Sequence, residues 1–284
     1  MPGIGGKFRG TLEAMDHPLQ AWRDTLEELG VMGLVREPVQ AVQAIPSAGP
    51  STPSPPRPPA PKPTPKPVTP PLAAYVPPSD PVACPTREVV AAAVSLPDLH
   101  QAIKGCLACP LGSGRMKFVF GEGHPEARLM FVGEGPGRDE DLQGRPFVGK
   151  AGELLDRMIG ALGMKREETY IANVVKCRPP DNRTPTPDEA RACLGYLHRQ
   201  IELIRPAVIV TLGATPLREL AGVSEGITKV RGQWRRVRVG DREIPVMPTF
   251  HPAYVLRQYT QEVRRAVWEG LRAAKEWLDH PVES

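Results

Sequence analysis

The chain has 284 residues, of which 40% are hydrophobic, and a formal net charge of +4. This hydrophobic content excludes a wholly disordered chain, and the lack of an apolar run of about 18 residues excludes a membrane span. Residues 1–10 are polar and lack the apolar core of a secretory signal, so we expect a cytoplasmic protein with reduced cysteines. The mild positive charge is compatible with a polyanionic partner, although many ordinary enzymes share it.

The N-terminal residues 1–36 contain one predicted amphipathic helix. Leu19, Trp22, Leu26 and Leu29 recur there at helical spacing. A single helix is too small to fold alone, so we expect this extension to dock on the main domain or to bind a partner.

Residues 37–94 are rich in proline. Of the 35 prolines in the chain, 18 lie between Pro38 and Pro85, where they alternate with Lys, Arg, Thr and Ala. Such a composition favours the extended polyproline II conformation of a semi-rigid tether. We therefore predict a disordered linker here, and we assign no role to Cys84 within it.

The main domain is predicted over residues 95–280. Short, nearly continuous apolar runs are typical of strands buried on both faces, and they occur at 128–133, 169–176, 207–213 and 244–250. Helices are predicted over 152–162 and 187–204, the second with Thr186 as N-cap and Glu189 closing a capping box. Strands that alternate with helices favour an α/β sandwich around a parallel sheet, in which ligands bind beyond the carboxyl ends of the strands.

Four cysteines follow the linker in two pairs. Cys106 and Cys109 form a Cys-x-x-Cys motif, whereas 15 residues separate Cys177 from Cys193, which falls on a predicted helix. Four thiolates hold either a zinc ion or an iron–sulfur cluster, and the spacing alone does not choose between them. The alternative is that Cys193 is a small core residue and that the Cys-x-x-Cys motif is incidental.

An acidic turn follows the first predicted strand. Glycines alternate over residues 133–137 and allow a ligand to approach the backbone closely, but Pro136 interrupts the spacing of a dinucleotide fingerprint. Glu134 lies at the turn, and Phe147 follows shortly after it. An acidic turn beside an aromatic ring is a poor phosphate site, and it suits a site that stabilises a cation and stacks on a flat ring.

Four sequence segments together resemble one known family. The segments GEGPG, GRPFVGKAG, NVVKCRPPDNRTPTP and TFHPAYVLR occur in this order between about residues 97 and 279. They resemble the family 4 uracil-DNA glycosylases, the iron–sulfur type of bacteria and archaea. The resemblance implies a three-layer α/β/α sandwich with a short central parallel sheet, and a monofunctional enzyme that flips deoxyuridine out of DNA and hydrolyses its N-glycosidic bond.

The resemblance also implies roles for individual residues. Asn173 would read O4 and N3–H of uracil with its amide, which mismatches cytosine, and Phe147 would stack on the flipped ring. His251 would donate to O2 and stabilise the departing uracil anion. Glu134 would offset the positive charge on the sugar or orient the attacking water.

Further roles concern the water and the thymine methyl group. Gly135 stands where the most active related families carry a water-activating Asp, so the group that positions the water stays open between Asn182 and Glu134. By the same resemblance, Glu140 would line the pocket near C5 of the base and reject thymine.

The same segments predict contacts with DNA. Leu256 would insert into the base stack where the flipped nucleotide leaves a gap. Thr215, with the turn at Gly213, would add backbone contacts. The residues expected to meet phosphates are all basic, and they are Arg145, Lys150, Arg183 and Arg257.

The cofactor and the partners follow from the resemblance as well. The implied cofactor is a structural [4Fe–4S] cluster, whose expected ligands are Cys106, Cys109, Cys177 and Cys193. The implied partner is uracil-containing DNA, single- or double-stranded. We expect a monomer that acts at the nucleoid in the cytoplasm, without a membrane partner.

Two other functions remain open at this stage. One is a related protein that binds uracil-DNA with little turnover, but that branch needs a nucleophilic histidine, and no histidine lies between Asn173 and Cys193. The other is a non-catalytic nucleic-acid-binding module held together by zinc. Colour separates this zinc module from an iron–sulfur glycosylase, because an iron–sulfur protein is brown and a zinc protein is colourless.

Overall fold

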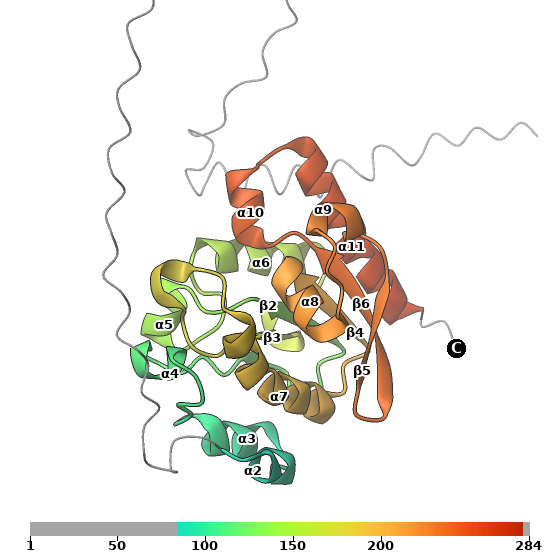
Figure 1. Cartoon of the computed structure of the whole chain (residues 1–284). Coiled ribbons are helices and arrows are strands. Elements are labelled where there is room, and N and C mark those ends of the chain that lie inside the picture. The colour runs from blue at the N-terminus through green and yellow to red at the C-terminus, as the bar shows by residue number, and fades with distance from the viewer. Residues whose placement is uncertain (1–84, 281–284) are drawn as a thin grey trace, which may run out of the picture.

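The computed structural model of the protein describes residues 85–280 (Figure 1). The helix predicted within residues 1–36, most of the predicted linker and Cys84 lie outside these residues. Helix α2 (Arg87–Ala92) falls within the predicted linker, so the folded part begins before residue 95. It is held to helix α7 (Pro187–Ile204) by Arg199, which donates to the carbonyl of Ala93 at 2.8 Å.

The sheet has six strands in the spatial order β1-β3-β2-β4-β6-β5 across the described residues. Their bounds are β1 (Glu122–Gly123), β2 (Leu129–Gly133), β3 (Tyr170–Asn173), β4 (Val208–Leu212), β5 (Arg235–Val239) and β6 (Arg242–Thr249). The four inner strands are parallel, whereas β1 and β5 add antiparallel edges. The predicted central parallel sheet is therefore confirmed, within a sheet that is mixed at its edges.

The inner strands follow from their apolar sequences. Every residue of β2, β3 and β4 is buried, as expected for strands that are covered on both faces. The edge strand β5 has the sequence RRVRV, in which Val237 and Val239 are buried while Arg236 and Arg238 are exposed. Its single apolar face explains why a search for continuous apolar runs missed it.

The remaining helical segments lie between and around the strands. The longer ones are α3 (Leu96–Ile103), α6 (Lys150–Ala161), α8 (Ala214–Ala221) and α11 (Gln261–Asp279). The shorter ones are α4 (Leu111–Gly114), α5 (Arg138–Gln143), η3 (Arg166–Glu168), η4 (Pro180–Asn182), α9 (Ile227–Val230) and α10 (Pro252–Arg257).

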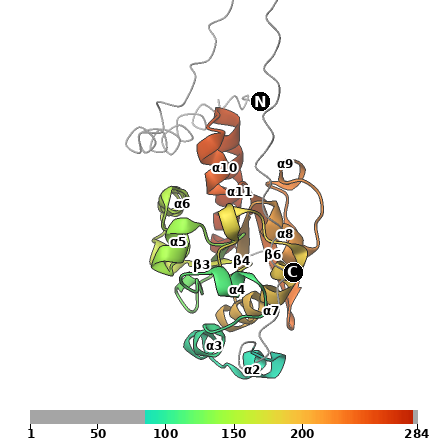
Figure 2. The same ribbon diagram turned by 60° about the vertical axis from the view of Figure 1, so that its left-hand side comes forward.

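Two cores lie on opposite faces of the sheet. Along β2, Met130 and Val132 enter one core with residues of α3, α7 and α8, whereas Leu129 and Phe131 enter the other with residues of α6 and α11. The alternation places successive side chains on opposite faces. Figure 2 shows the strands between α7 and α11, so the predicted three-layer α/β/α sandwich is confirmed.

The start of α7 matches the prediction from its sequence. The hydroxyl of Thr186 accepts from the backbone N–H of Glu189, and the Glu189 carboxylate accepts from the N–H of Thr186 at 2.8 Å. This capping box fixes where the chain turns from the loop after β3 into α7.

Among the helices of residues 85–280, none combines the length and the apolar composition that a membrane-spanning helix needs.

Candidate active site

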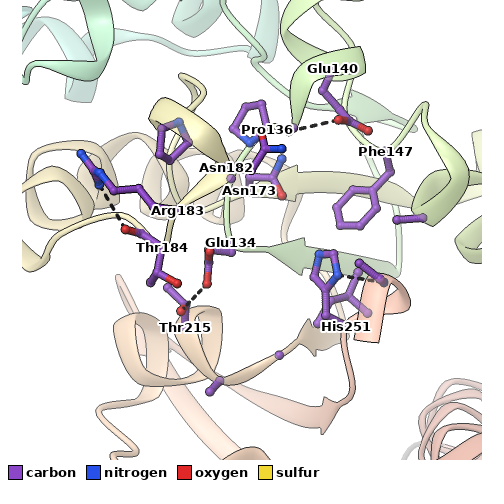
Figure 3. A pocket seen from close by; sticks show the side chains of 18 of the residues that line it. Glu134, Pro136, Glu140, Phe147, Asn173, Asn182, Arg183, Thr184, Thr215 and His251 are labelled. Carbon is purple, nitrogen blue, oxygen red and sulfur yellow. Dashed lines mark hydrogen bonds between the residues drawn. The ribbon is translucent and has the colours of Figure 1, made fainter. Parts of the chain in front are cut away.

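A cavity of about 620 Å³ lies where β2, β3, β4 and β6 end. Its walls come from the segments after these strands, as expected for the carboxyl edge of a parallel sheet. Figure 3 shows Phe147 and His251 on one side of this cavity and Glu134 with Thr215 on another. The predicted residues that line it include Glu134, Gly135, Glu140, Phe147, Asn173, Asn182, Arg183, Thr215, His251 and Arg257.

Asn173 is the last residue of β3, and its side chain is buried. Its Oδ1 has no hydrogen-bond partner among the described residues, although the residue is only 2% exposed. A buried polar atom without a partner is costly and points to a ligand that supplies one. The oxygen faces Gly133, where an added Cβ would lie 2.4 Å from Oδ1 and 2.7 Å from Cζ of Phe147. Only glycine at position 133 lets the amide and the ring approach this closely.

His251 follows β6 and is the N-cap of α10. Its Nδ1 accepts from the backbone N–H of Ala253 at 3.1 Å, so the proton of the neutral imidazole resides on Nε2. Burial, together with the positive charge of Arg257, lowers the pKa of His251 to about 4. His251 is therefore a neutral donor at physiological pH, and its ring centroid lies 5.5 Å from that of Phe147.

Glu134 follows β2, and its carboxylate is held by a hydroxyl from another segment of the cavity wall. The hydroxyl of Thr215, near the start of α8, donates to Oε2 of Glu134 at 2.6 Å. Thr215 is 5% exposed. Sequence reasoning predicted only backbone contacts for Thr215. A hydroxyl directly after a strand in a glycine turn was the only available signal for this hydrogen bond.

Glu140 lines the cavity, and its carboxylate is engaged by the backbone. Oε2 accepts from the N–H of Gly137 at 3.0 Å, and Oε1 accepts from Val148 at 2.9 Å and from Gly149 at 3.2 Å. These hydrogen bonds tie the acidic turn to the segment that carries Phe147. Glu140 therefore stabilises the pocket wall through backbone hydrogen bonds, a role that the sequence did not reveal.

Asn182 and Arg183 lie on the rim of the cavity, in the loop after β3. Asn182 Oδ1 accepts from Arg178 Nε at 2.8 Å. The guanidinium of Arg183 forms a two-point ion pair with Glu189, with distances of 2.7 and 2.8 Å. Both side chains are thus held in place by hydrogen bonds to other residues of the protein.

The other predicted DNA contacts differ in their positions. Arg257 is exposed and lines the cavity, whereas Lys150 is exposed at the start of α6 and lies outside the lining. Leu256 is partly buried and packs against the core that contains α11. Arg145 is ion-paired with Glu122 at 2.8 Å.

The structure brings the four cysteines of the main domain together from three segments. Burial raises the pKa of Cys177 to about 11 and that of Cys193 to about 12, and in both cases the nearby Cys109 raises the pKa further. Burial also raises the pKa of Cys109, with a contribution from Cys106. Each thiol thus lies within electrostatic reach of other members of the set. A bound metal favours the thiolate form of a cysteine ligand.

The donor set fits a cluster. Within residues 85–280, no three His, Cys, Asp or Glu side chains are grouped closely enough to hold one metal ion. Four separate thiolates suit an iron–sulfur cluster, in which each one binds its own iron. The Lys176 ammonium is fully buried, donates to the Asn173 carbonyl and to Gln200 Oε1, and faces Cys177 and Cys193. An anionic cluster on these thiolates would give the buried cation a counterion.

Comparison with known proteins first identifies the superfamily to which the chain belongs and then its family. The model of the uracil DNA glycosylase superfamily matches residues 120–272. The type-4 uracil-DNA glycosylase of Thermotoga maritima is 49% identical over 197 residues, which are 68% of this chain and 97% of that protein. The type-4 enzyme of Sulfurisphaera tokodaii is 44% identical over 187 residues, covering 64% of this chain and 84% of that protein. The chain belongs to the type-4 uracil-DNA glycosylases.

A second branch of the superfamily is more distant. The type-5 uracil-DNA glycosylase of Thermus thermophilus is 33% identical over 117 residues, which are 36% of this chain and 53% of that protein. The resemblance stated from the sequence segments is thus confirmed at the level of the type-4 family.

Proposed function

We propose that this chain removes uracil from DNA by hydrolysing the N-glycosidic bond of a flipped deoxyuridine, as the first step in repair of deaminated cytosine. The observation that carries this proposal is the buried Oδ1 of Asn173, which lacks a partner among the described residues. The N3–H of uracil supplies the missing donor. Cytosine presents an acceptor at that position and leaves the amide oxygen unpaired.

Phe147 and His251 complete the base site. The flipped base stacks on the Phe147 ring, which forms the cavity wall opposite Glu134 and Thr215. The Nε2–H of His251 donates to uracil O2. As the bond from N1 to C1′ breaks, its electron pair goes to the base, and the donor meets the negative charge that develops on O2.

Glu134 acts on the sugar side. Its Oε2 is held by Thr215, so Oε1 remains for the developing cation at C1′ or for the attacking water. The water oxygen bonds to C1′, and its proton leaves to solvent or to the carboxylate. Asn182, which also lines the cavity, is the second candidate for orienting this water.

The cysteines hold the cofactor in this proposal. Cys106, Cys109, Cys177 and Cys193 bind a [4Fe–4S] cluster, which ties the N-terminal part of the domain to the loop after β3. Glycosidic hydrolysis requires no electron transfer, so the cluster acts as a structural cross-link. Arg257, Lys150 and Arg183 meet phosphates around the rim, and Leu256 fills the gap in the base stack, with the chain acting as a monomer.

A uracil-containing oligonucleotide tests the proposal. The chain, purified without oxygen, should convert it to an abasic product that alkali cleaves, and it should leave matched thymine and cytosine oligonucleotides intact. The same sample should be brown and should contain about four iron atoms per chain. Tight binding of uracil-DNA without cleavage would contradict the enzymatic proposal, and a colourless, zinc-containing active enzyme would contradict the cofactor alone.

A further inference from the structure

The ring that faces the base comes from a residue with an unusual backbone conformation. Phe147 has a φ of 50°, in the left-handed region, and is 4% exposed. Bulky side chains rarely adopt this conformation, which costs about 1–3 kcal/mol unless the surroundings impose it. The contacts of the neighbouring peptide groups show what imposes it.

The peptide groups around Phe147 are held from two sides. On one side, the N–H of Val148 donates to Glu140. On the other, Arg166 donates from Nη2 to the carbonyl of Pro146 at 2.6 Å and from Nη1 to the carbonyl of Phe147 at 3.2 Å. The planar guanidinium thus spans two successive carbonyls, which fixes the orientation of the peptide between them.

Arg166 is itself fixed by two carboxylates. Its Nε donates to Glu122 on β1 at 2.9 Å, and its Nη1 lies 2.6 Å from Oδ1 of Asp156 on α6. The side chain is only 14% exposed. A partly buried guanidinium with this many fixed partners has one available geometry. Arg166 therefore fixes the Phe147 loop relative to β1 and α6.

We propose that Arg166 is a positioning residue for uracil recognition, which sets the Phe147 ring in its stacking orientation without touching the base. Arg166 does not line the cavity. Its contact with Phe147 is through the backbone carbonyl, on the opposite side of the loop from Glu140. This inference rests on the proposed function, because it assumes that the base stacks on Phe147.

The proposal specifies a kinetic signature. Stacking of a base on an aromatic ring contributes about 1–3 kcal/mol to binding, and it acts on bound substrate and transition state alike. Loss of the ring orientation should therefore raise KM while kcat changes little. Arg166→Gln should raise KM between about 5-fold and 100-fold, which is the range that stacking predicts.

Arg199 offers a matched control. It also donates to a backbone carbonyl, that of Ala93, and forms an ion pair with Glu202 at 2.7 Å, but it lies on the other face of the sheet. Arg199→Gln removes the same kinds of contact. We expect it to lower the melting temperature to an extent similar to that of Arg166→Gln, with KM unchanged.

The decisive measurement is a double-mutant cycle with Phe147→Ala, using steady-state kinetics on a uracil oligonucleotide and melting curves for every variant. Once the ring is absent, Arg166→Gln should raise KM no further, within about twofold. An equal rise in both backgrounds, an unchanged KM in Arg166→Gln, or a rise in Arg199→Gln would overturn the proposal.

Arg166→Lys covers the case in which Arg166→Gln fails to fold. Lysine keeps the charge beside Glu122 but cannot span both carbonyls, so KM should again rise, and a KM equal to that of the wild type would overturn the proposal. A wild-type chain that leaves uracil-DNA intact would contradict the proposed function itself. An active wild type with unaffected Arg166 variants would contradict only the role of Arg166.

Discussion

Thr215 donates a hydrogen bond of 2.6 Å from its hydroxyl to Oε2 of Glu134, joining the segment after β4 to the turn after β2. In the proposed mechanism, the bond leaves the other carboxylate oxygen to face the sugar. It also fixes the direction of that oxygen, because Thr215 is buried and Glu134 lies on a glycine-rich turn.

Removing this hydroxyl should impair the chemical step. A hydrogen bond to a charged group contributes about 1.5–3 kcal/mol, so Thr215→Val should slow single-turnover cleavage by about 10-fold to 100-fold. Thr215→Ser keeps the donor and should retain a rate close to that of the wild type. A Thr215→Val variant as fast as Thr215→Ser would show that Glu134 needs no orientation from this side.

Asn173 and His251 should divide recognition from chemistry. His251→Ala should leave binding of uracil-DNA nearly intact while slowing single-turnover cleavage by roughly 10²–10³, the usual cost of one oxyanion donor. Asn173→Asp replaces the donor end of the amide with an acceptor, so it should bind uracil poorly and give weak cytosine excision. Rates and binding titrations on both variants test this division, and a His251→Ala variant that loses only binding would refute the role of His251.

The protonation of His251 should be visible in its pH dependence. Burial, with the nearby charge of Arg257, lowers its pKa from 6.5 to about 4 in the folded chain. Between these values the unfolded chain binds the proton and the folded chain does not, so the free energy of unfolding should fall as pH falls from 6.5 towards 4. The ring signals of His251 in a nuclear magnetic resonance titration should shift near pH 4, and Arg257→Gln should raise this pKa. A titration near 6.5 would contradict a neutral, desolvated donor.

The proposed cluster ligands should matter for stability more than for intrinsic chemistry. Cys177→Ser removes a link between the segment at Cys106 and the loop after β3, so the visible absorbance should fall and the melting temperature should drop. Cys84→Ser is the matched control, because Cys84 lies in the predicted linker, and it should change neither property. A Cys177→Ser variant that keeps full colour and an unchanged melting temperature would remove Cys177 from the ligand set.

Residues 1–84 should be dispensable for uracil excision. Among residues 85–280, those that line the cavity lie between Glu134 and Arg257, and the first described helix is capped by Thr86. A chain that begins at Pro85 should fold, remain brown and excise uracil at a rate within about twofold of the full chain. An insoluble or inactive product would show that the predicted N-terminal helix is part of the folded domain.

The sequence predicted most of what depends on local pattern. Continuous apolar runs located the inner strands, and Thr186 with Glu189 located the start of α7. The resemblance to the family 4 enzymes placed Asn173 and His251 at one site, and both line the same cavity.

Contacts between distant segments were not predictable in this way. The hydrogen bond from Thr215 to Glu134 joins residues 81 positions apart, and Arg166 meets Phe147 from 19 positions away. No periodicity or spacing encodes such pairs, because they exist only once the sheet has assembled. The edge strand β5 was missed for a different reason, since its exposed arginines break the apolar run.

The chemical groups of the site are distributed over the four inner strands of the sheet. Asn173 ends β3, whereas Glu134, Thr215 and His251 follow β2, β4 and β6 respectively, so no pair of neighbouring strands carries the complete set. His251 is reached only near the end of the chain, and its strand pairs with β4 across a long sequence separation. Partly folded or incompletely synthesised chains therefore lack the site as a unit. During refolding, uracil excision should return only with the slow, long-range pairing of β6, which makes catalytic activity a reporter of complete assembly.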